Sequence, residues 1–304
     1  MEESKPREGK EILKNRAFVM IMSFIAILLT QISDLGAKSP YAISFSSNLV
    51  NQGNVVLIKV QVKNGEIPHV SWMDKKIPLV ANSQKTDWYG FLGADLISKP
   101  GTYEVHLRVI PSGYKRHFEV RVIEKDYGIR QLTLPKNMVD LDAETLKRAR
   151  QESRIMRSLW EAPSSDPLWN GPFLMPLSGE IMGNFGLRSI INDQTRSPHS
   201  GVDLRAEAGT PVRAINNGRV VLVADHFFSG RSIVLDHGGG IQSMYFHLEK
   251  ILVGKDRPVN KGDIIGLVGS TGRSTGPHLH WGIRVNGARV EPLELIELSK
   301  QLQE

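Results

Sequence analysis

The sequence contains no cysteine, which excludes every site that depends on a thiol. Disulfide frameworks, thiolate metal sites and cysteine nucleophiles are therefore ruled out. A transition metal in this protein must be held by histidine and carboxylate instead. Because the chain has only nine histidines in 304 residues, their positions decide whether it has metal chemistry.

Aromatic residues are scarce as well, at 7% of the chain, and neither sign of charge dominates. The 38 Lys and Arg residues exceed the 32 Asp and Glu residues to give a net charge of +6. This mild excess suits an anionic polymer, but without a clustered patch it predicts no nucleic-acid partner. With 40% hydrophobic and 23% charged residues, the composition is globular, and it excludes collagen-like, disordered and polytopic membrane proteins. At about 150 residues per domain, the length predicts two domains.

An uncharged apolar run, AFVMIMSFIAILL, covers residues 17–29 and follows a segment with five basic residues. A basic region, a short apolar core and small residues around Gly36-Ala37 are typical of a secretory signal. The run is short for a membrane span, although the residues after it could extend it. We therefore predict that residues 1–37 form a signal peptide or an uncleaved signal anchor. The rest of the chain would then lie in the periplasm or cell envelope, touching the membrane only through an uncleaved segment.

Residues 41–125 alternate apolar and polar side chains with a period of two, and turn signals such as Asn64-Gly65 and Pro100-Gly101 separate the runs. This spacing predicts a small β-sandwich-like domain over residues 38–128. No catalytic constellation is visible in it, and we expect the domain to serve in spacing, binding or gating. Its three histidines are isolated from one another in the sequence and are interpreted as surface residues: His69, His106 and His117.

The period changes between residues 129 and 175. Asp142 can cap a helix, and apolar residues follow it at nearly helical spacing, with many arginines between them. The helix is expected to pack against a domain rather than lie on a membrane surface. The segment 161–172 (EAPSSDPLWNGP) is dense in Pro and Ser, which is typical of a linker. We therefore assign residues 129–175 to a helix and a linker.

Six of the nine histidines lie between His199 and His280, in motifs bordered by Gly-rich turns and β-patterned runs. His199 and Asp203 form H-S-G-V-D, His247 lies in Y-F-H-L, and His278 and His280 form H-L-H. Alternate side chains of a strand point to the same face, so both histidines of H-L-H are expected in one pocket. His199, Asp203 and one member of that pair can make a two-histidine, one-aspartate zinc site that keeps one position open for water.

Residues 176–298 resemble the lysostaphin-type zinc metallopeptidases, the M23 or LytM family of peptidoglycan endopeptidases. The resemblance implies an antiparallel β-sheet metallopeptidase domain with its metal in a groove, so the whole chain is expected to be mainly β. The segments that carry it are FGLR (185–188), HSGVDLRA (199–206), GTPVRAINNGRV (209–220), IVLDHGGG (233–240), YFHL (245–248) and VNKGDIIGLVGSTGRSTGPHLHW (259–281).

The resemblance also implies a role for each matching residue. His199, Asp203 and His280 match the ligands of one Zn²⁺ ion, and His247 and His278 match the two catalytic histidines that do not bind metal. The implied reaction is hydrolysis of peptide cross-links in peptidoglycan, with the peptide stems as substrate. A neutral histidine can take the proton of the attacking water, and a protonated one can stabilise the oxyanion or assist the departing amine. We interpret His278 as the base and His247 as the stabiliser.

Three more residues are candidates for a substrate groove. Arg188 of FGLR could meet a substrate carboxylate or fix its own loop, and Tyr245 shares a strand face with His247 if the period of two continues. His237, at the end of a predicted strand, could line the groove or close a turn. The alternative function is a non-catalytic protein of the envelope that binds peptidoglycan or activates another hydrolase. Retention of all five metal-site and catalytic positions favours the enzyme.

Overall fold

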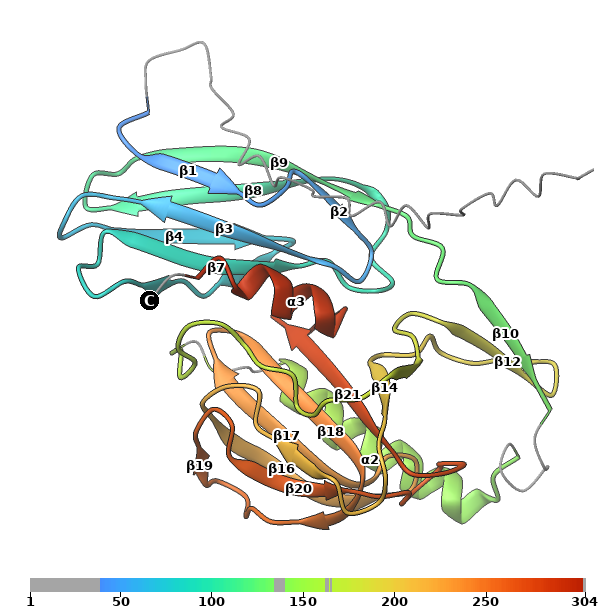
Figure 1. The fold of residues 1–304 in the computed structure, drawn as a ribbon. Helices are drawn as coiled ribbons and strands as arrows, with labels where there is room; N and C mark the ends of the chain where they lie inside the picture. The colour runs from blue at the N-terminus through green and yellow to red at the C-terminus, as the bar shows by residue number, and fades with distance from the viewer. Residues whose placement is uncertain (1–38, 134–139, 162–163, 165, 303–304) are drawn as a thin grey trace, which may run out of the picture.

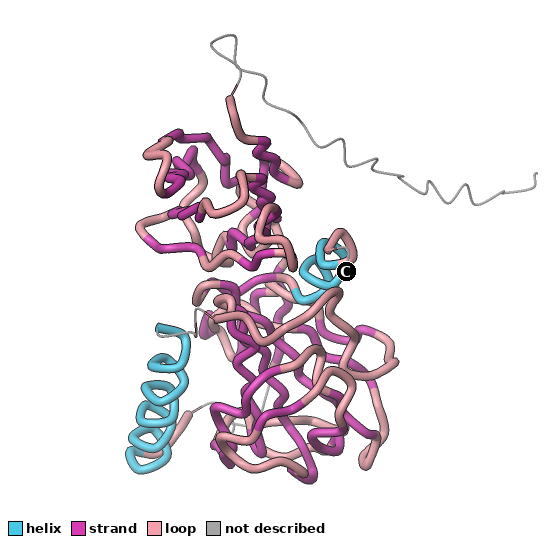
Figure 2. The backbone as a smooth tube through the Cα atoms, turned by 90° about the vertical axis from the view of Figure 1, so that its left-hand side faces the viewer, coloured by secondary structure: helices cyan, strands magenta, loops and turns pink. Residues whose placement is uncertain are grey.

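The computed structural model describes residues 39–133, 140–161, 164 and 166–302 (Figures 1 and 2). The predicted signal segment, residues 1–37, lies outside these described residues. Strands dominate the described part and two helices accompany them, which confirms the mainly β prediction. None of the helices in that part is both long and apolar enough to cross a membrane.

The first domain is a sandwich of two sheets, as the alternation predicts. One sheet has the strand order β1-β3-β7-β6 and the other β2-β9-β8-β4-β5. Side chains of β8 alternate strictly: Val105, Leu107 and Val109 are buried between the sheets, while the residues between them are exposed. The strands are β1 (Ala42–Phe45), β2 (Leu49–Asn51), β3 (Val55–Gln61), β4 (Ile67–Trp72), β5 (Lys75–Ile77), β6 (Val80–Ala81), β7 (Asp87–Gly93), β8 (Gly101–Ile110) and β9 (Lys115–Ile123).

The second domain is built on an antiparallel sheet with the main order β11-β14-β21-β18-β17-β16-β19. At its sides β22 pairs with β21, and β20 pairs with both β18 and β15. The strands are β11 (Ile181–Gly183), β14 (Val202–Arg205), β15 (Pro211–Arg213), β16 (Gly218–His226), β17 (Gly230–Gly238), β18 (Ile241–Ile251), β19 (Pro258–Val259), β20 (Ile264–Val268), β21 (His278–Val285) and β22 (Ala288–Val290). Most of its buried apolar residues lie in one cluster.

The predicted helix is α2 (Ala143–Glu161), and it lies beside the second domain (Figure 2). Asp142 caps it, since Asp142 Oδ1 accepts the N–H of Thr145 at 2.7 Å. The helix packs on the sheet as expected for its apolar stripe. The contact joins Met156, Leu159 and Trp160 of α2 to a small buried cluster of Leu222, Val234 and Met244.

The described parts of the predicted linker are anchored rather than free. Before α2, β10 (Ile129–Leu132) pairs in parallel with β12 (Arg188–Ile191), whose other neighbour is β13 (Gln194–Thr195). After α2, Ser164 donates from its N–H and its hydroxyl to Asp236 Oδ2. Trp169 and Phe173 are buried in the core of the second domain. The described linker residues after α2 thus have irregular backbone, and the aromatic side chains among them pack in the core of the second domain.

The two domains touch through side chains and through α3 (Pro292–Ser299), which lies between them (Figure 1). The guanidinium of Arg289, on β22, donates two hydrogen bonds to the Asp95 carboxylate, at 2.5 and 3.1 Å. Asn286 Nδ2–H donates to the carbonyl of Phe91, and the Phe91 side chain belongs to the buried cluster of the second domain. The domains therefore share part of one core.

Candidate metal centre

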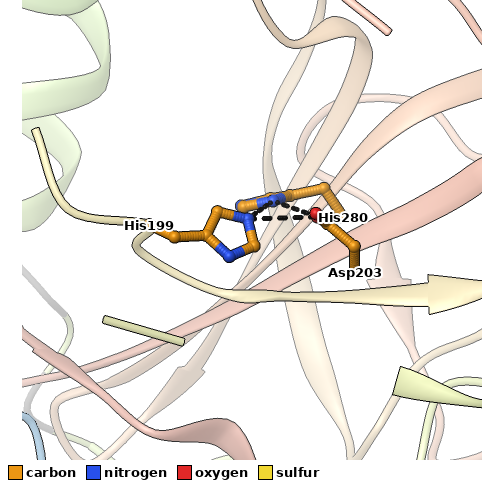
Figure 3. Close-up of side chains that lie close together, drawn as sticks. All are labelled: His199, Asp203 and His280. Atoms are coloured by element: carbon orange, nitrogen blue, oxygen red, sulfur yellow. Dashed lines mark hydrogen bonds and ion pairs between the residues drawn. The ribbon is translucent and has the colours of Figure 1, made fainter. Parts of the chain in front are cut away.

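Three of the predicted residues converge where β14 meets β21 (Figure 3). Asp203 on β14 and His280 on β21 are direct cross-strand partners, and His199 reaches them from the loop before β14. His199 Nε2 lies 2.9 Å from His280 Nδ1 and 3.1 Å from Asp203 Oδ1, and the latter two atoms are 3.0 Å apart. Within the described residues, no other group of three His, Asp or Glu side chains brings its donor atoms together in this way.

This donor set fits a transition metal such as zinc. Two imidazole nitrogens and one carboxylate oxygen are ligands that zinc accepts, and tetrahedral bonds of about 2.0–2.1 Å place ligand atoms roughly 3.3 Å apart. The three observed separations are a few tenths of an ångström shorter than this. His199 Nδ1–H donates to the carbonyl of Asn184 at 2.9 Å, which leaves the lone pair of Nε2 for the site.

The surroundings keep the carboxylate ionised. Burial opposes ionisation of Asp203, but hydrogen bonds and charge from His199 and His280 outweigh it and hold the pKa of Asp203 well below its usual range. Burial also lowers the pKa of His280, in part against the attraction of Asp203. An anionic oxygen therefore lies beside two imidazoles at neutral pH and is available to a cation.

Two glycines give the backbone room for these side chains. A Cβ atom at Gly183 on β11 would lie 2.2 Å from Asp203 Oδ2, and one at Gly201 would lie 2.9 Å from His280 Nε2. Both distances are well inside van der Waals contact, so a larger residue would displace a candidate ligand. Gly201 belongs to H-S-G-V-D, so this motif supplies two candidate metal ligands and also the glycine that lets the backbone lie close to His280.

His247 and His278 lie beside the group of three. Their ring centroids are 4.8 Å apart, and His278 Nε2 is 3.8 Å from Asp203 Oδ1. His247 Nδ1–H donates to the Thr271 carbonyl at 2.8 Å and His278 Nδ1–H to the Gly276 carbonyl at 2.9 Å. Burial lowers the pKa of His247 to about 4, so this ring is neutral at neutral pH. Both rings are therefore held in a tautomer whose Nε2 can accept a proton.

Tyr245 and His237 are not exposed to a groove. Both are fully buried and are linked through Ser243 Oγ, which is hydrogen-bonded to His237 Nε2 at 2.7 Å and to Tyr245 Oη at 2.9 Å. The expected shared face of Tyr245 and His247 is wrong, because His247 has a φ of 63° and this left-handed conformation breaks the alternation of β18. His237 Nδ1–H donates to the Asn217 carbonyl, so this histidine supports the core.

Arg188 is exposed at the start of β12, where its N–H donates to the carbonyl of Gly128. Its backbone therefore joins the strand that leads out of the first domain to the second. A contact between its guanidinium and a substrate carboxylate stays a prediction.

Phe246 touches a candidate ligand although sequence reasoning does not single it out. It is the cross-strand partner of His280, and the two rings stack with 5.3 Å between centroids and 6° between planes. Its position directly before His247 in Y-F-H-L is the only signal the sequence offers. The groups that orient His199 and His247 are the backbone carbonyls of Asn184 and Thr271, which no residue type marks.

Fold and site together define a class: an antiparallel β-sheet domain with a two-histidine, one-aspartate cluster suited to a metal ion and two further histidines beside it. Residues 197–292, which contain all five side chains, match the profile of Peptidase family M23. A Pseudomonas aeruginosa protein whose crystal structure is described as a peptidase M23 is 31% identical, with a TM-score of 0.65, over 81% of this chain and 94% of that chain. The chain belongs to peptidase family M23.

Curated relatives are similar over a shorter length. Peptidoglycan DD-endopeptidase ShyA of Vibrio cholerae is 43% identical over 115 residues, which are 38% of this chain and 27% of ShyA. DD-carboxypeptidase/endopeptidase Mpg of Neisseria meningitidis is 38% identical over 115 residues, which are 38% of this chain and 26% of Mpg. The chain thus matches about a quarter of the length of these relatives.

Proposed function

We propose that this protein is a zinc metalloendopeptidase that hydrolyses peptide cross-links of bacterial peptidoglycan. The observation that carries the proposal is the convergence of His199, Asp203 and His280, with His247 and His278 beside them. Membership of family M23 supports peptide hydrolysis. Similarity to ShyA, named as a peptidoglycan DD-endopeptidase, supports the substrate.

In this mechanism His199, Asp203 and His280 would hold the zinc ion through two nitrogens and one carboxylate oxygen. When bound, zinc supplies a Lewis acid that polarises the scissile carbonyl and lowers the pKa of a water molecule toward neutrality. His278 accepts the proton of the attacking water at Nε2, which Gly276 leaves free by holding Nδ1–H.

His247 offers a second free Nε2 next to the ring of His278. The His278 imidazolium then passes this proton to the departing amine, and His247 can donate a hydrogen bond to the oxyanion only while its own Nε2 carries a proton. The carbonyls of Thr271 and Gly276 keep both rings oriented throughout, because each holds an Nδ1–H that does not take part in the transfer. We assign His278 as the base and His247 as the stabiliser.

The test uses the full-length protein, loaded with zinc and incubated with purified cross-linked peptidoglycan, and identifies the released muropeptides by mass spectrometry. We expect cleaved cross-links from the native protein and none from His280→Ala. His117→Ala, which removes an exposed histidine of the first domain, serves as the matched control and should act like the native protein. Equal cleavage by His280→Ala would contradict the proposal. Binding without cleavage by the native protein would instead favour a non-catalytic envelope protein.

We also propose that residues 1–37 carry the rest of the chain across the cytoplasmic membrane. The support is the order of charge and hydrophobicity in that segment alone. A reporter that works only outside the cytoplasm, fused after Glu304, should be active. It should lose activity when charged residues interrupt the run 17–29, and an inactive fusion with the native segment would contradict export.

A further inference from the structure

One flank of α2 carries a row of cations. Lys147, Arg150, Arg154 and Arg157 follow one another at intervals of three and four residues, so they form a single stripe along the helix. All four are exposed. The residues that pack α2 on the sheet include Met156 and Trp160, on the neighbouring stripe. This basic stripe (Lys147, Arg150, Arg154 and Arg157) therefore runs along the edge where the helix meets the second domain.

The basic stripe is one wall of a groove of about 1070 Å³, which Arg196 and Phe228 line from the second domain. We call it the basic groove. Its charged lining consists of the four cations of the stripe, Arg196 and a single carboxylate, Asp140. Asp140 Oδ1 accepts a hydrogen bond from the Gln194 amide, whose oxygen accepts one from Arg196, and this one carboxylate leaves the lining with an excess of positive charge.

These cations have no carboxylate partners among the described residues. The ion pair that α2 does make, Arg148 with Glu152, lies outside the groove, where Glu152 also accepts the N–H of Phe227. Like charges three and four residues apart oppose helix formation. Arg196 also buries its Nε atom with no hydrogen-bond partner. An arrangement that repels itself and leaves a buried donor unpaired becomes favourable when an anion is bound.

The inner end of the groove adjoins the loop that orients the catalytic histidines. The guanidinium of Arg273 lies 4.3 Å from the ring centroid of Phe228, and the backbone N–H of Arg273 donates to the Phe228 carbonyl at 2.9 Å. Arg273 belongs to the loop whose carbonyls, from Thr271 and Gly276, hold His247 and His278. Burial and the nearby positive charge of Arg196 lower the pKa of Arg273, which shows that these two cations lie close enough to repel each other. The groove and the loop that holds His247 and His278 therefore meet at Phe228.

We propose that the basic groove is the subsite that binds the carboxylates of an acidic stem peptide while its cross-link is cleaved. The proposal rests on the proposed function, and it adds a preference for stems with free carboxylates over stems in which these groups are amides. The planar guanidinium matches a carboxylate through two parallel hydrogen bonds, which a neutral amide cannot reproduce. Arg150 and Arg154, at the middle of the stripe, are expected to carry most of this preference.

The test measures binding of two dye-labelled stem peptides, one with free carboxylates and one with the corresponding amides, by fluorescence anisotropy. We expect the full-length native protein to prefer the acidic peptide, and Arg150→Gln/Arg154→Gln to bind it roughly three- to tenfold more weakly. The loss should shrink at high salt. Equal binding of both peptides by the native protein, or native-like binding of the acidic peptide by the double variant, would overturn the proposal.

Two matched variants separate the groove from general charge. Arg150→Lys/Arg154→Lys keeps both charges and should retain most of the affinity. Arg121→Gln removes an exposed arginine from β9 of the first domain and should bind like the native protein. Glutamine is nearly as good a helix former as arginine, so α2 is preserved in the double variant.

Further measurements keep the groove and the enzyme apart. Binding is also measured with His280→Ala, which should keep the preference for the acidic peptide although it cannot cleave. If the native protein binds the acidic peptide selectively but cleaves no cross-link, the proposed function is refuted and the groove is supported. Cleavage of both kinds of stem at equal rates would support the function and refute the groove. Vesicles of equal parts phosphatidylcholine and phosphatidylglycerol are the rival ligand. If Arg150→Gln/Arg154→Gln loses vesicle binding but keeps peptide binding, the groove serves a membrane and the proposal is wrong.

Discussion

The two domains place histidines on antiparallel strands in different ways. In the first domain His69, His106 and His117 lie exposed on the outer face of the sheet formed by β4, β8 and β9. His106 and His117 are direct cross-strand partners, and His69 faces Arg108. In the second domain His199 and His280 of the candidate metal centre are largely enclosed around the Asp203 carboxylate.

The difference teaches what a strand scaffold needs in order to build a site. On a regular sheet, neighbouring side chains stand side by side and roughly parallel, so even paired histidines such as His106 and His117 do not converge. In the second domain His199 arrives from a loop, and His247 leaves the alternation through its left-handed backbone. Asp203 then supplies the negative charge, with its Oδ1 at 3.1 Å from His199 Nε2 and 3.0 Å from His280 Nδ1.

The largest expected effect comes from removing histidines from one domain and, separately, from the other, and comparing the zinc content and activity of the two variants. His199→Ala should lose its zinc and at least about 10³-fold in activity, because a metal centre contributes several kcal/mol to the transition state. The triple variant His69→Ala/His106→Ala/His117→Ala should keep one zinc per chain and activity within about twofold of native. Bound zinc is measured by mass spectrometry after loading, and activity by muropeptide release. Loss of zinc from the triple variant would show that the exposed histidines also take part.

The second effect concerns acid. His237 is fully buried, and burial lowers its pKa to about 4. An unfolded histidine takes its proton near pH 6.5, so the stability linked to neutral His237 is complete above about pH 6.5 and is lost as the pH falls toward 4. The full loss is about 3 kcal/mol. The described part of the first domain buries no histidine, so acid should open the second domain first.

Hydrogen exchange resolved by peptide measures this order of opening at about pH 7.5 and about pH 5. Peptides from β17 and β18 should lose protection in acid more than peptides from β8 and β9. His237→Gln cannot take a proton in this range, and its stability should depend less on pH over the same interval. An NMR titration of the His237 ring in the native protein gives an independent reading. A titration near pH 6.5 would refute the prediction.

Much of this fold follows from local patterns. The period of two predicts the sandwich of the first domain, because each strand there has one face toward the core, and Asp142 with the apolar spacing after it predicts α2. H-S-G-V-D and H-L-H predict that His199 and Asp203 meet one histidine of the pair, and the family resemblance implies His280, which is the cross-strand partner of Asp203.

What the sequence could not give depends on long-range geometry. Tyr245 is misplaced by alternation because His247 has a left-handed backbone, which its residue type does not signal. The arginines of α2 are visible in the sequence, but their position beside Arg196 and Phe228 depends on how the helix docks on the sheet. The described linker residues are likewise fixed by partners far along the chain, such as Asp236.

The third effect is the contribution of an ion pair across the domain interface to stability, compared with that of an ion pair inside the first domain. Arg289→Ala removes the cation that binds Asp95 across the interface, where the two side chains are only 16% and 25% exposed. A largely buried carboxylate without its partner should cost about 2 kcal/mol and loosen the contact between β7 and β22. Lys59→Ala breaks the pair with Asp87 inside the first domain, and because that lysine is 42% exposed, solvent screening limits its effect to about 0.5 kcal/mol. Urea unfolding compares the two variants, and equal losses would mean that Arg289 does not join the domains.

The smallest effect concerns the aromatic ring that stacks on His280, a candidate zinc ligand. Phe246 stacks on His280, so Phe246→Leu should weaken zinc binding about two- to tenfold through loss of roughly 0.5–1.5 kcal/mol of ring contact. Phe45→Leu is the matched control, because it breaks the ring pair of Phe45 and Phe118 in the first domain and should leave zinc affinity unchanged. Competition with a chromogenic chelator measures both affinities. A shift in Phe246→Leu alone would mean that the ring positions the ligand, whereas equal shifts would mean that zinc affinity only follows the stability of the whole chain.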